Sequence, residues 1–413
     1  MTTLALISLI ITTAALFGWF SSRVLRLPIT IGTMFLTVVS SMLLIALSQR
    51  FAGLHAWAVS LVGRVNFENL ILHGMLGLLL FAGAFLLDLA YLSREKLMVG
   101  LLSVVGTVFS TISVAGLMHW VLPLLGLQAP WIECLFFGAL ISPTDPIAVL
   151  DMLRRVGVSK NIEAQLAGES LFNDGVGAVL FITVLDASRG ANPSLTHVAG
   201  EFLLKSGGGL ILGIGLAWIA SELMRRVDAY QVEILLAVSL ALGGYALAET
   251  LSVSAPLEAV AAGLALRRFN ARYVHSEIAH ESLDHFWCVI DEIQNAILFV
   301  LLGLEMLLIP FTRVAFFSGA LAIVGVTAVR ALAVGIVITT IRFLQKDHRT
   351  SFLTLTWGGL RGGLSIALAL SIPEAQGRTW ILATTYLVVV FSILVQGGTL
   401  GLFLKRFNKT EVA

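Results

Sequence analysis

The sequence predicts an all-α polytopic membrane protein with thirteen transmembrane helices. Its 413 residues are 58% hydrophobic and only 12% charged, whereas a soluble domain has roughly 45–50% apolar and about 25% charged residues. A soluble globule of this length would need a more polar surface, so most of the chain is expected to lie in lipid. The formal net charge of +1 supplies no basic surface for nucleic acid, which argues against a nucleic-acid-binding protein.

Thirteen segments are apolar enough to be membrane spans, which take about 20 residues each; the segment 256–267 is shorter than this. They are residues 4–20, 29–48, 70–91, 98–122, 131–151, 162–186, 198–223, 231–250, 256–267, 283–308, 314–341, 350–372 and 379–403. The stretch 49–69 is interrupted by Arg50, His55 and Arg64 and is expected to lie at the surface. The first span lacks a basic segment before it and a small-residue cleavage site after it, so it is predicted to be a membrane span rather than a signal peptide.

The distribution of Lys and Arg tests this span count, because cytoplasmic loops collect basic residues. With thirteen spans, eighteen of the 26 Lys and Arg residues lie on the side of the C-terminus and five on the opposite side. The other three, Lys205, Arg330 and Arg361, lie within spans. A wrong count would scramble this asymmetry. The sequence therefore predicts a multi-pass membrane protein with the N-terminus outside and the C-terminus in the cytoplasm.

Two of the spans contain helix-breaking motifs at matching positions. Thirteen spans divide into six, one and six, and such halves enter the membrane from opposite sides, as in transporters that bind substrate at discontinuous helices. The fifth span of the first half contains Ser142-Pro143-Thr144-Asp145-Pro146, and its counterpart in the second half contains Gly358-Gly359-Leu360-Arg361-Gly362-Gly363. Proline removes backbone donors and glycine weakens helices. Both helices are expected to break in a buried or watered region.

The broken helices also carry opposite charges. Half-helix ends expose partial charges of opposite sign, and one break contains Asp145 while the other contains Arg361. Either residue is therefore a candidate to neutralise a helix end. Asp145 is equally a candidate cation ligand.

The sixth span carries a cluster of polar side chains. It contains Glu169, Ser170, Asn173 and Asp174, and ionisable residues inside a membrane are costly and are functional candidates by default. Hard cations prefer oxygen ligands, so Asp174, Ser170 and Thr144 are the expected ligands of a cation such as Na⁺. Because burial disfavours a charged carboxylate, Asp174 is expected to hold either one proton or one cation, never both.

The remaining charges within the spans are assigned structural roles. Glu169 is expected to form an ion pair with Arg361. Arg330 lies in the middle of a span and needs an acidic partner, for which the candidates are Glu305, Asp291 and Glu292. Cys134 and Cys288 lie far apart without a CxxC pair, which predicts neither a disulfide framework nor a zinc site. No cofactor is expected.

These motifs resemble the monovalent cation:proton antiporter-1 family, which includes the prokaryotic sodium/proton antiporters and the animal sodium/proton exchangers. The resemblance covers nearly the whole chain and rests on 142–146, on Glu169-Ser170 with Asn173-Asp174, and on 359–363, in that order. It implies two inverted six-helix repeats whose broken helices cross in the core. It also implies a homodimer, with a transport core made of residues 98–187 and 313–413 and a dimerisation domain made of residues 1–97 and 188–312.

The resemblance further implies a secondary active antiporter rather than an enzyme. Na⁺ or Li⁺ would exchange for H⁺ as the core moves like an elevator against the dimerisation domain. Asp174 would be the shared cation and proton site, assisted by Ser170 and Thr144, with Asn173 as its polar neighbour. Electrogenic relatives carry a second acid where Asn173 stands, so 1:1 electroneutral exchange is expected. The partners would be monovalent cations, protons and the lipid bilayer.

The sequence departs from this family at one point and leaves other functions open. Many members carry an acid just after the Phe of the third span, whereas Phe81 is followed by Ala82; Asp88, further along, is a secondary candidate, as is Arg330. A K⁺/H⁺ antiporter of the same fold is the main alternative. Remote alternatives are a cation channel and an intramembrane aspartyl protease, whose two acids would share a proton but would not require the glycines around Arg361.

Overall fold

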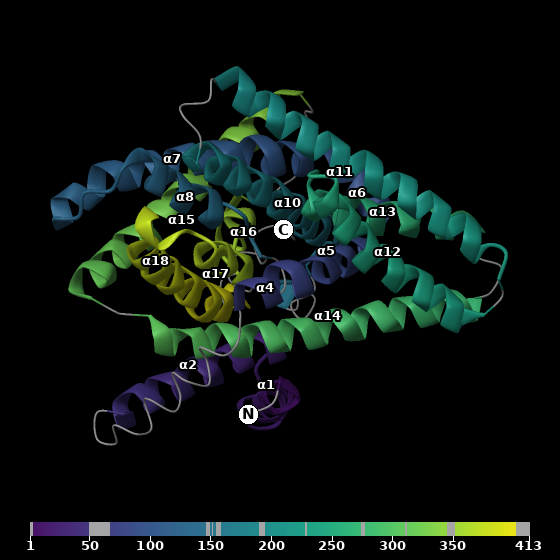
Figure 1. The fold of residues 1–413 in the computed structure, drawn as a ribbon, viewed down its shortest axis with the longest axis horizontal. Coiled ribbons are helices and arrows are strands. Elements are labelled where there is room, and N and C mark those ends of the chain that lie inside the picture. The colour runs from purple at the N-terminus through teal and green to yellow at the C-terminus, as the bar shows by residue number, and fades with distance from the viewer. Residues whose placement is uncertain are drawn as a thin grey trace, which may run out of the picture.

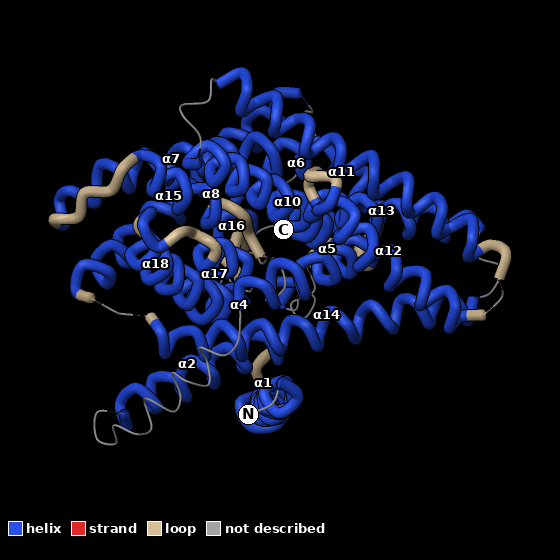
Figure 2. The backbone as a smooth tube through the Cα atoms, viewed as in Figure 1, coloured by secondary structure: helices blue, strands red, loops and turns tan. Residues whose placement is uncertain are grey.

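The computed structural model is helical throughout the part of the chain that it describes (Figure 2). The described residues are 3–48, 67–145, 149–150, 152–153, 158–189, 195–227, 229–273, 277–309, 312–344 and 352–401. Within these ranges there is no β-strand. The predicted surface segment 49–69 lies almost entirely outside the described residues.

The helices follow the predicted spans closely along the chain. Their bounds are α1 (Thr3–Phe20), α2 (Ile29–Ser48), α4 (Phe67–Asn69), α5 (Leu76–Phe85), α6 (Leu89–Gly100), α7 (Thr107–Val121), α8 (Trp131–Ile141), α10 (Lys160–Arg189), α11 (Leu195–Met224), α12 (Tyr230–Thr250), α13 (Ala255–Tyr273), α14 (Glu277–Glu305), α15 (Arg313–Leu344), α16 (Phe352–Trp357), α17 (Gly363–Leu370) and α18 (Arg378–Phe391). Short π-helical segments lie at Ser21–Leu25, Leu70–Met75, Leu101–Gly106 and Ser392–Gly397, and 3-10 turns at Leu122–Leu125, Met306–Leu308 and Glu374–Gln376.

Nine of the helices in the described ranges are long and apolar enough to cross a membrane, and two shorter apolar helices accompany them. Each of the thirteen predicted spans contains helix over at least part of its length. The polytopic helical fold is therefore confirmed. The count of thirteen, the inverted repeats and the orientation of the termini stay predictions.

The predicted boundary between the third and fourth spans is wrong. The third span was expected to run over 70–91, but α5 ends at Phe85 and a single helical stretch then runs from Leu89 to Leu125. The reason is Asp88, whose carboxylate accepts hydrogen bonds from the backbone N–H groups two and three residues further on, at 2.9 and 3.4 Å. Asp is a preferred residue for such a helix N-cap. Asp88 is exposed and caps the start of a helix; its part as a secondary ligand stays a prediction.

The outer surface of the molecule exposes many large apolar side chains. Trp120, Leu204 and Ile211 expose 76%, 74% and 74% of their surface, and only 17% of the most apolar window of the first helix is buried. Large exposed apolar areas mark contact with another apolar phase. These faces are the ones that a lipid bilayer would cover.

The helices form two groups joined by one long helix (Figure 1). At one end of the view, α11 and α12 pack on α13, and α13 also packs on α5. At the other end, α7 packs on α8 and α15 packs on α18. Helix α14 runs along both groups and contacts α2, α5, α12 and α17. Helix α10 lies between the two groups and contacts α8 of one and α13 of the other (Figure 1).

Candidate functional site

The two predicted helix breaks are present, and they touch each other. Helix α8 ends at Ile141, and the chain between α16 and α17 leaves the helical path from 358 to 362. The backbone N–H of Asp145 donates to the carbonyl of Leu360 at 2.7 Å, so a hydrogen bond joins the two non-helical segments directly. Pro146, the second proline of the first motif, lies outside the described residues.

Arg361 binds the end of the first broken helix. Its guanidinium donates through Nη1 to the carbonyls of Ser142 and Pro143, the latter at 2.8 Å. Its backbone N–H donates to Ser392 Oγ at 2.9 Å. A proline cannot donate to the carbonyls that precede it, and a cation at a helix C-terminus is favourable. The buried Arg361 side chain (3% exposed) therefore satisfies carbonyls that the break leaves free.

The predicted pair between Glu169 and Arg361 is wrong, because Glu169 pairs with Arg330 instead. Nη1 and Nη2 of the Arg330 guanidinium both donate to the Glu169 carboxylate, Nη2 at 2.8 Å. Nη2 also donates to the carbonyl of Leu355 at 2.9 Å. Glu169 is 0% exposed and Arg330 is 5% exposed, so this is a buried bidentate pair. A Cβ at Gly359 would lie 2.6 Å from Arg330 Nε, so a glycine is needed there to make room for the guanidinium.

The acids proposed from the sequence as partners of Arg330 are therefore also wrong. Glu169 and Arg330 are 161 residues apart in the chain, and no spacing rule connects them. The sequence showed that acidic and basic residues lie in different spans. Which acid pairs with Arg330 depended on how α10 and α15 pack.

The hydroxyl and amide side chains near Asp174 form a closed network. Thr144 Oγ1 and Ser170 Oγ lie 2.9 Å apart, and Asn173 Nδ2 donates to Thr144 Oγ1 at 2.9 Å. The backbone N–H of Thr144 donates to Asn173 Oδ1 at 3.1 Å. All three residues are buried. Asn173 thus fixes the non-helical backbone at Thr144, and the network holds the first break against α10.

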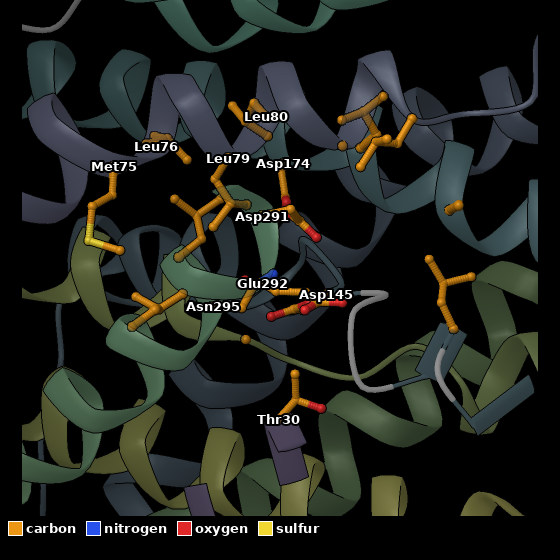
Figure 3. A pocket seen from close by; sticks show the side chains of 18 of the residues that line it. Thr30, Met75, Leu76, Leu79, Leu80, Asp145, Asp174, Asp291, Glu292 and Asn295 are labelled. Atoms are coloured by element: carbon orange, nitrogen blue, oxygen red, sulfur yellow. The ribbon is translucent and has the colours of Figure 1, made fainter. Parts of the chain in front are cut away.

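Asp174 and Asp145 line one cavity of about 250 Å³ (Figure 3). Gly362 and Thr144 line the same cavity. A Cβ at Gly362 would overlap the Asp145 carboxylate, so the close approach of the two breaks requires glycine here. Ser170 and Asn173 do not line the cavity in the described part of the chain. They lie behind Thr144, which they bind.

The cavity has further polar residues that the sequence did not assign to the site. Asp291, Glu292 and Asn295 reach it from α14, and Thr30 reaches it from α2 (Figure 3). Helix α5, the third span, contributes apolar side chains and Gly83. The signal that should have found the acids was their place within a predicted span, where ionisable residues are functional candidates.

Replacing Arg361 with alanine is expected to destabilise the protein by about 1–3 kcal/mol, since buried carbonyls left without a partner cost roughly that much. The loss should appear as a lower midpoint of thermal unfolding in detergent. Arg361→Lys is the matched comparison, because lysine keeps the charge but lacks the fork of donors, and it should recover part of the loss. An Arg361→Ala variant as stable as the parent would contradict this role.

Comparisons with known proteins agree with this architecture. The family model described as "Sodium/hydrogen exchanger, transmembrane" matches residues 8–406. The chain is 40% identical over 410 residues to the Na(+)/H(+) antiporter NhaP of Pseudomonas aeruginosa, covering 98% of this chain and 96% of that one. It is 34% identical to the Na(+)/H(+) antiporter NhaH of Halobacillus aidingensis, covering 76% and 77%. The solved structure of the sodium proton antiporter MjNhaP1 from Methanocaldococcus jannaschii superposes with a TM-score of 0.76 at 20% identity, covering 98% of each chain, and shares the fold.

Proposed function

The chain belongs to the sodium/hydrogen exchanger family, and from this we propose that it is a secondary active antiporter that exchanges Na⁺ for H⁺ across a membrane. The main support is the cavity in which Asp174 and Asp145 lie beside two interrupted helices. Non-helical backbone inside a membrane protein is tolerated where it lines a watered cavity, and transporters bind their ions at such breaks.

The proposed mechanism is competition of a cation and a proton for Asp174. Na⁺ would be bound by the carboxylate of Asp174 with oxygens from Asp145 and Thr144, because hard cations prefer such ligands. Ser170 and Asn173 would position Thr144. A proton on Asp174 removes the charge that attracts the cation. Since either ion neutralises the same single charge, the exchange is 1:1 and electroneutral.

Movement of one helix group against the other would give alternating access. The cavity lies between α10 with the two breaks on one side and α2, α5 and α14 on the other. These two walls belong to the proposed transport core (98–187 and 313–413) and the proposed dimerisation domain (1–97 and 188–312). Sliding of the core would carry Asp174 past a fixed wall. We extend the proposal to a homodimer in a prokaryotic inner membrane, with the N-terminus outside.

The test is ion exchange in proteoliposomes that contain the purified protein. An inward Na⁺ gradient is expected to alkalinise the lumen, at a rate that does not change when the membrane potential is clamped at different values. Li⁺ and K⁺ gradients across a pH series would identify the preferred cation, and a K⁺-only response would support the K⁺/H⁺ alternative. Electrical current without coupled proton movement would indicate a channel. Absence of proton movement with every alkali cation would overturn the proposal.

A further inference from the structure

Helix α13 carries a buried acid that the exchange site does not use. Glu258 lies in the first turn of this helix and is 0% exposed. Both of its carboxylate oxygens are buried without a hydrogen-bond partner among the described residues, although buried polar groups are normally hydrogen-bonded. Glu258 is not one of the described residues that line the cavity of Asp174. An ionisable side chain within a predicted span is a functional candidate, so its burial here requires an explanation.

Two neighbouring helices, α11 and α12, enclose Glu258 by presenting glycine to it (Figure 1). Gly209 and Gly213 let α11 approach the backbone of α13 closely, since a Cβ at either position would overlap backbone atoms there. A Cβ at Gly244 of α12 would overlap the Glu258 carboxylate. The carboxyl group therefore fills the space of a side chain at position 244 and lies against the backbone of α12.

The titratable groups that α12 brings to this region already have partners. The Tyr245 hydroxyl donates to the carbonyl of Leu72 at 2.9 Å. Glu249, one turn further along α12, contacts His73 Nδ1 at 2.6 Å. Helix α12 contains no Lys, Arg or His, so it supplies no counter-charge for a carboxylate on Glu258.

The other helices that pack on α13 do not supply a counter-charge either. Lys205 is the single Lys or Arg of α11, and its Nζ contacts Asp186 of α10 at 2.8 Å. Helix α5 contains no titratable side chain. Helix α10 approaches α13 at Gly175, whose charged neighbour in the chain is the acid Asp174. Among the described residues, a carboxylate on Glu258 would therefore be buried without a cation.

Burial without a cation favours the neutral form of this side chain. An ionised carboxylate that leaves water without a partner is so costly that the group takes up a proton instead. A protonated carboxyl group is a hydrogen-bond donor, and the backbone carbonyls of α12 beside Gly244 are acceptors. We propose that Glu258 is a second proton-binding site: a carboxylic acid that keeps its proton at neutral pH, fastens α13 to the backbone of α12 and is not exchanged.

The site predicts how the stability of the protein depends on pH. In the folded protein the acid keeps its proton, whereas a glutamate in an unfolded chain ionises above about pH 4. Folding then takes up a proton, so the site makes the stability fall as the pH rises above this value. Glu258→Gln keeps the size and a donor but does not titrate. The thermal midpoint of the parent protein in detergent should therefore fall more steeply with rising pH than that of Glu258→Gln. Equal slopes would overturn the proposal.

Infrared spectroscopy reads the protonation state directly and needs no exchange activity. At neutral pH, the difference spectrum between the parent protein and Glu258→Gln should contain the C=O band of a protonated carboxyl group and no carboxylate bands. The matched control is Glu249→Gln, the same change at an exposed position of α12 beside His73, which should show carboxylate bands. Carboxylate bands in the Glu258→Gln difference spectrum would overturn the site.

A second variant guards against a folding defect in Glu258→Gln. Glu258→Met places an unbranched, adaptable apolar side chain there, and a site that holds a neutral acid should accept at least one of these two neutral residues. Failure of both variants to fold would overturn the proposal.

Exchange measurements separate this inference from the proposed function. Glu258→Gln should retain Na⁺-driven proton movement in proteoliposomes, because Glu258 does not line the cavity. Loss of exchange in a folded Glu258→Gln variant would show that the proton of Glu258 belongs to the transport cycle and would overturn the site as a separate one. A parent protein that shows the protonated-carboxyl band but exchanges no Na⁺ would overturn the proposed function and support the site.

Discussion

Replacing Asp174 with asparagine is expected to abolish Na⁺-driven proton movement in proteoliposomes. The carboxylate is the group for which the cation and the proton compete. An amide of nearly the same shape is not protonated at neutral pH and carries no negative charge to attract Na⁺. Asp174 lies in the middle of α10 and faces the cavity, so its loss removes the only carboxylate that this helix brings to the cavity within the described residues.

The same variant should stay folded, because Asp174 is partly exposed to the cavity and is not one of the two partners in the buried ion pair. The matched control is Asp186→Asn, which makes the same chemical change three turns further along α10. There the carboxylate contacts Lys205 at 2.8 Å in a partly exposed pair, and such pairs contribute about 0–1 kcal/mol. Asp186→Asn should exchange Na⁺ normally. Sodium-dependent proton flux in the Asp174→Asn variant would show that Asp174 is not the shared cation and proton site.

Replacing Glu169 with glutamine is expected to lower the free energy of unfolding by about 3–5 kcal/mol, the usual cost of removing one partner of a buried ion pair. The change leaves the guanidinium of Arg330 buried among α10, α15 and α16 without its counter-charge. The measurement is thermal or denaturant unfolding in detergent. Neutralising both partners, with Glu169→Gln and Arg330→Gln together, should recover part of the loss because no uncompensated charge is left.

A double-mutant cycle decides which arginine is the partner of Glu169. Residues in direct contact couple by about 0.5–3 kcal/mol, so the cycle between Glu169 and Arg330 should give a coupling in the upper part of this range. The cycle between Glu169 and Arg361 should give a smaller coupling, because Arg361 donates to the carbonyls of Ser142 and Pro143. A larger coupling for Arg361 than for Arg330 would contradict the pairing in the structure.

Features that depend only on neighbouring residues in the chain could be predicted from the sequence. The apolar spans were predictable because bilayer thickness fixes the length of a spanning helix. The two breaks were predictable because Pro143 and the glycines around Arg361 act on the backbone where they stand. The polar cluster on α10 was predictable because Glu169, Ser170, Asn173 and Asp174 occupy adjacent faces of one helix. The helix start at Asp88 had a local signal too, since Asp is a favoured N-cap.

The sequence by itself therefore determined that this chain is a helical membrane protein with an acid beside two interrupted helices. Only the tertiary structure decided which charges meet. It paired Glu169 with Arg330, directed Arg361 to the end of α8, and brought Asp291, Glu292 and Asn295 of α14 to the cavity. The physical reason is that electrostatic and hydrogen-bond partners are chosen by distance in space. In a bundle of long helices, that distance is set by the packing of whole helix faces and not by separation along the chain.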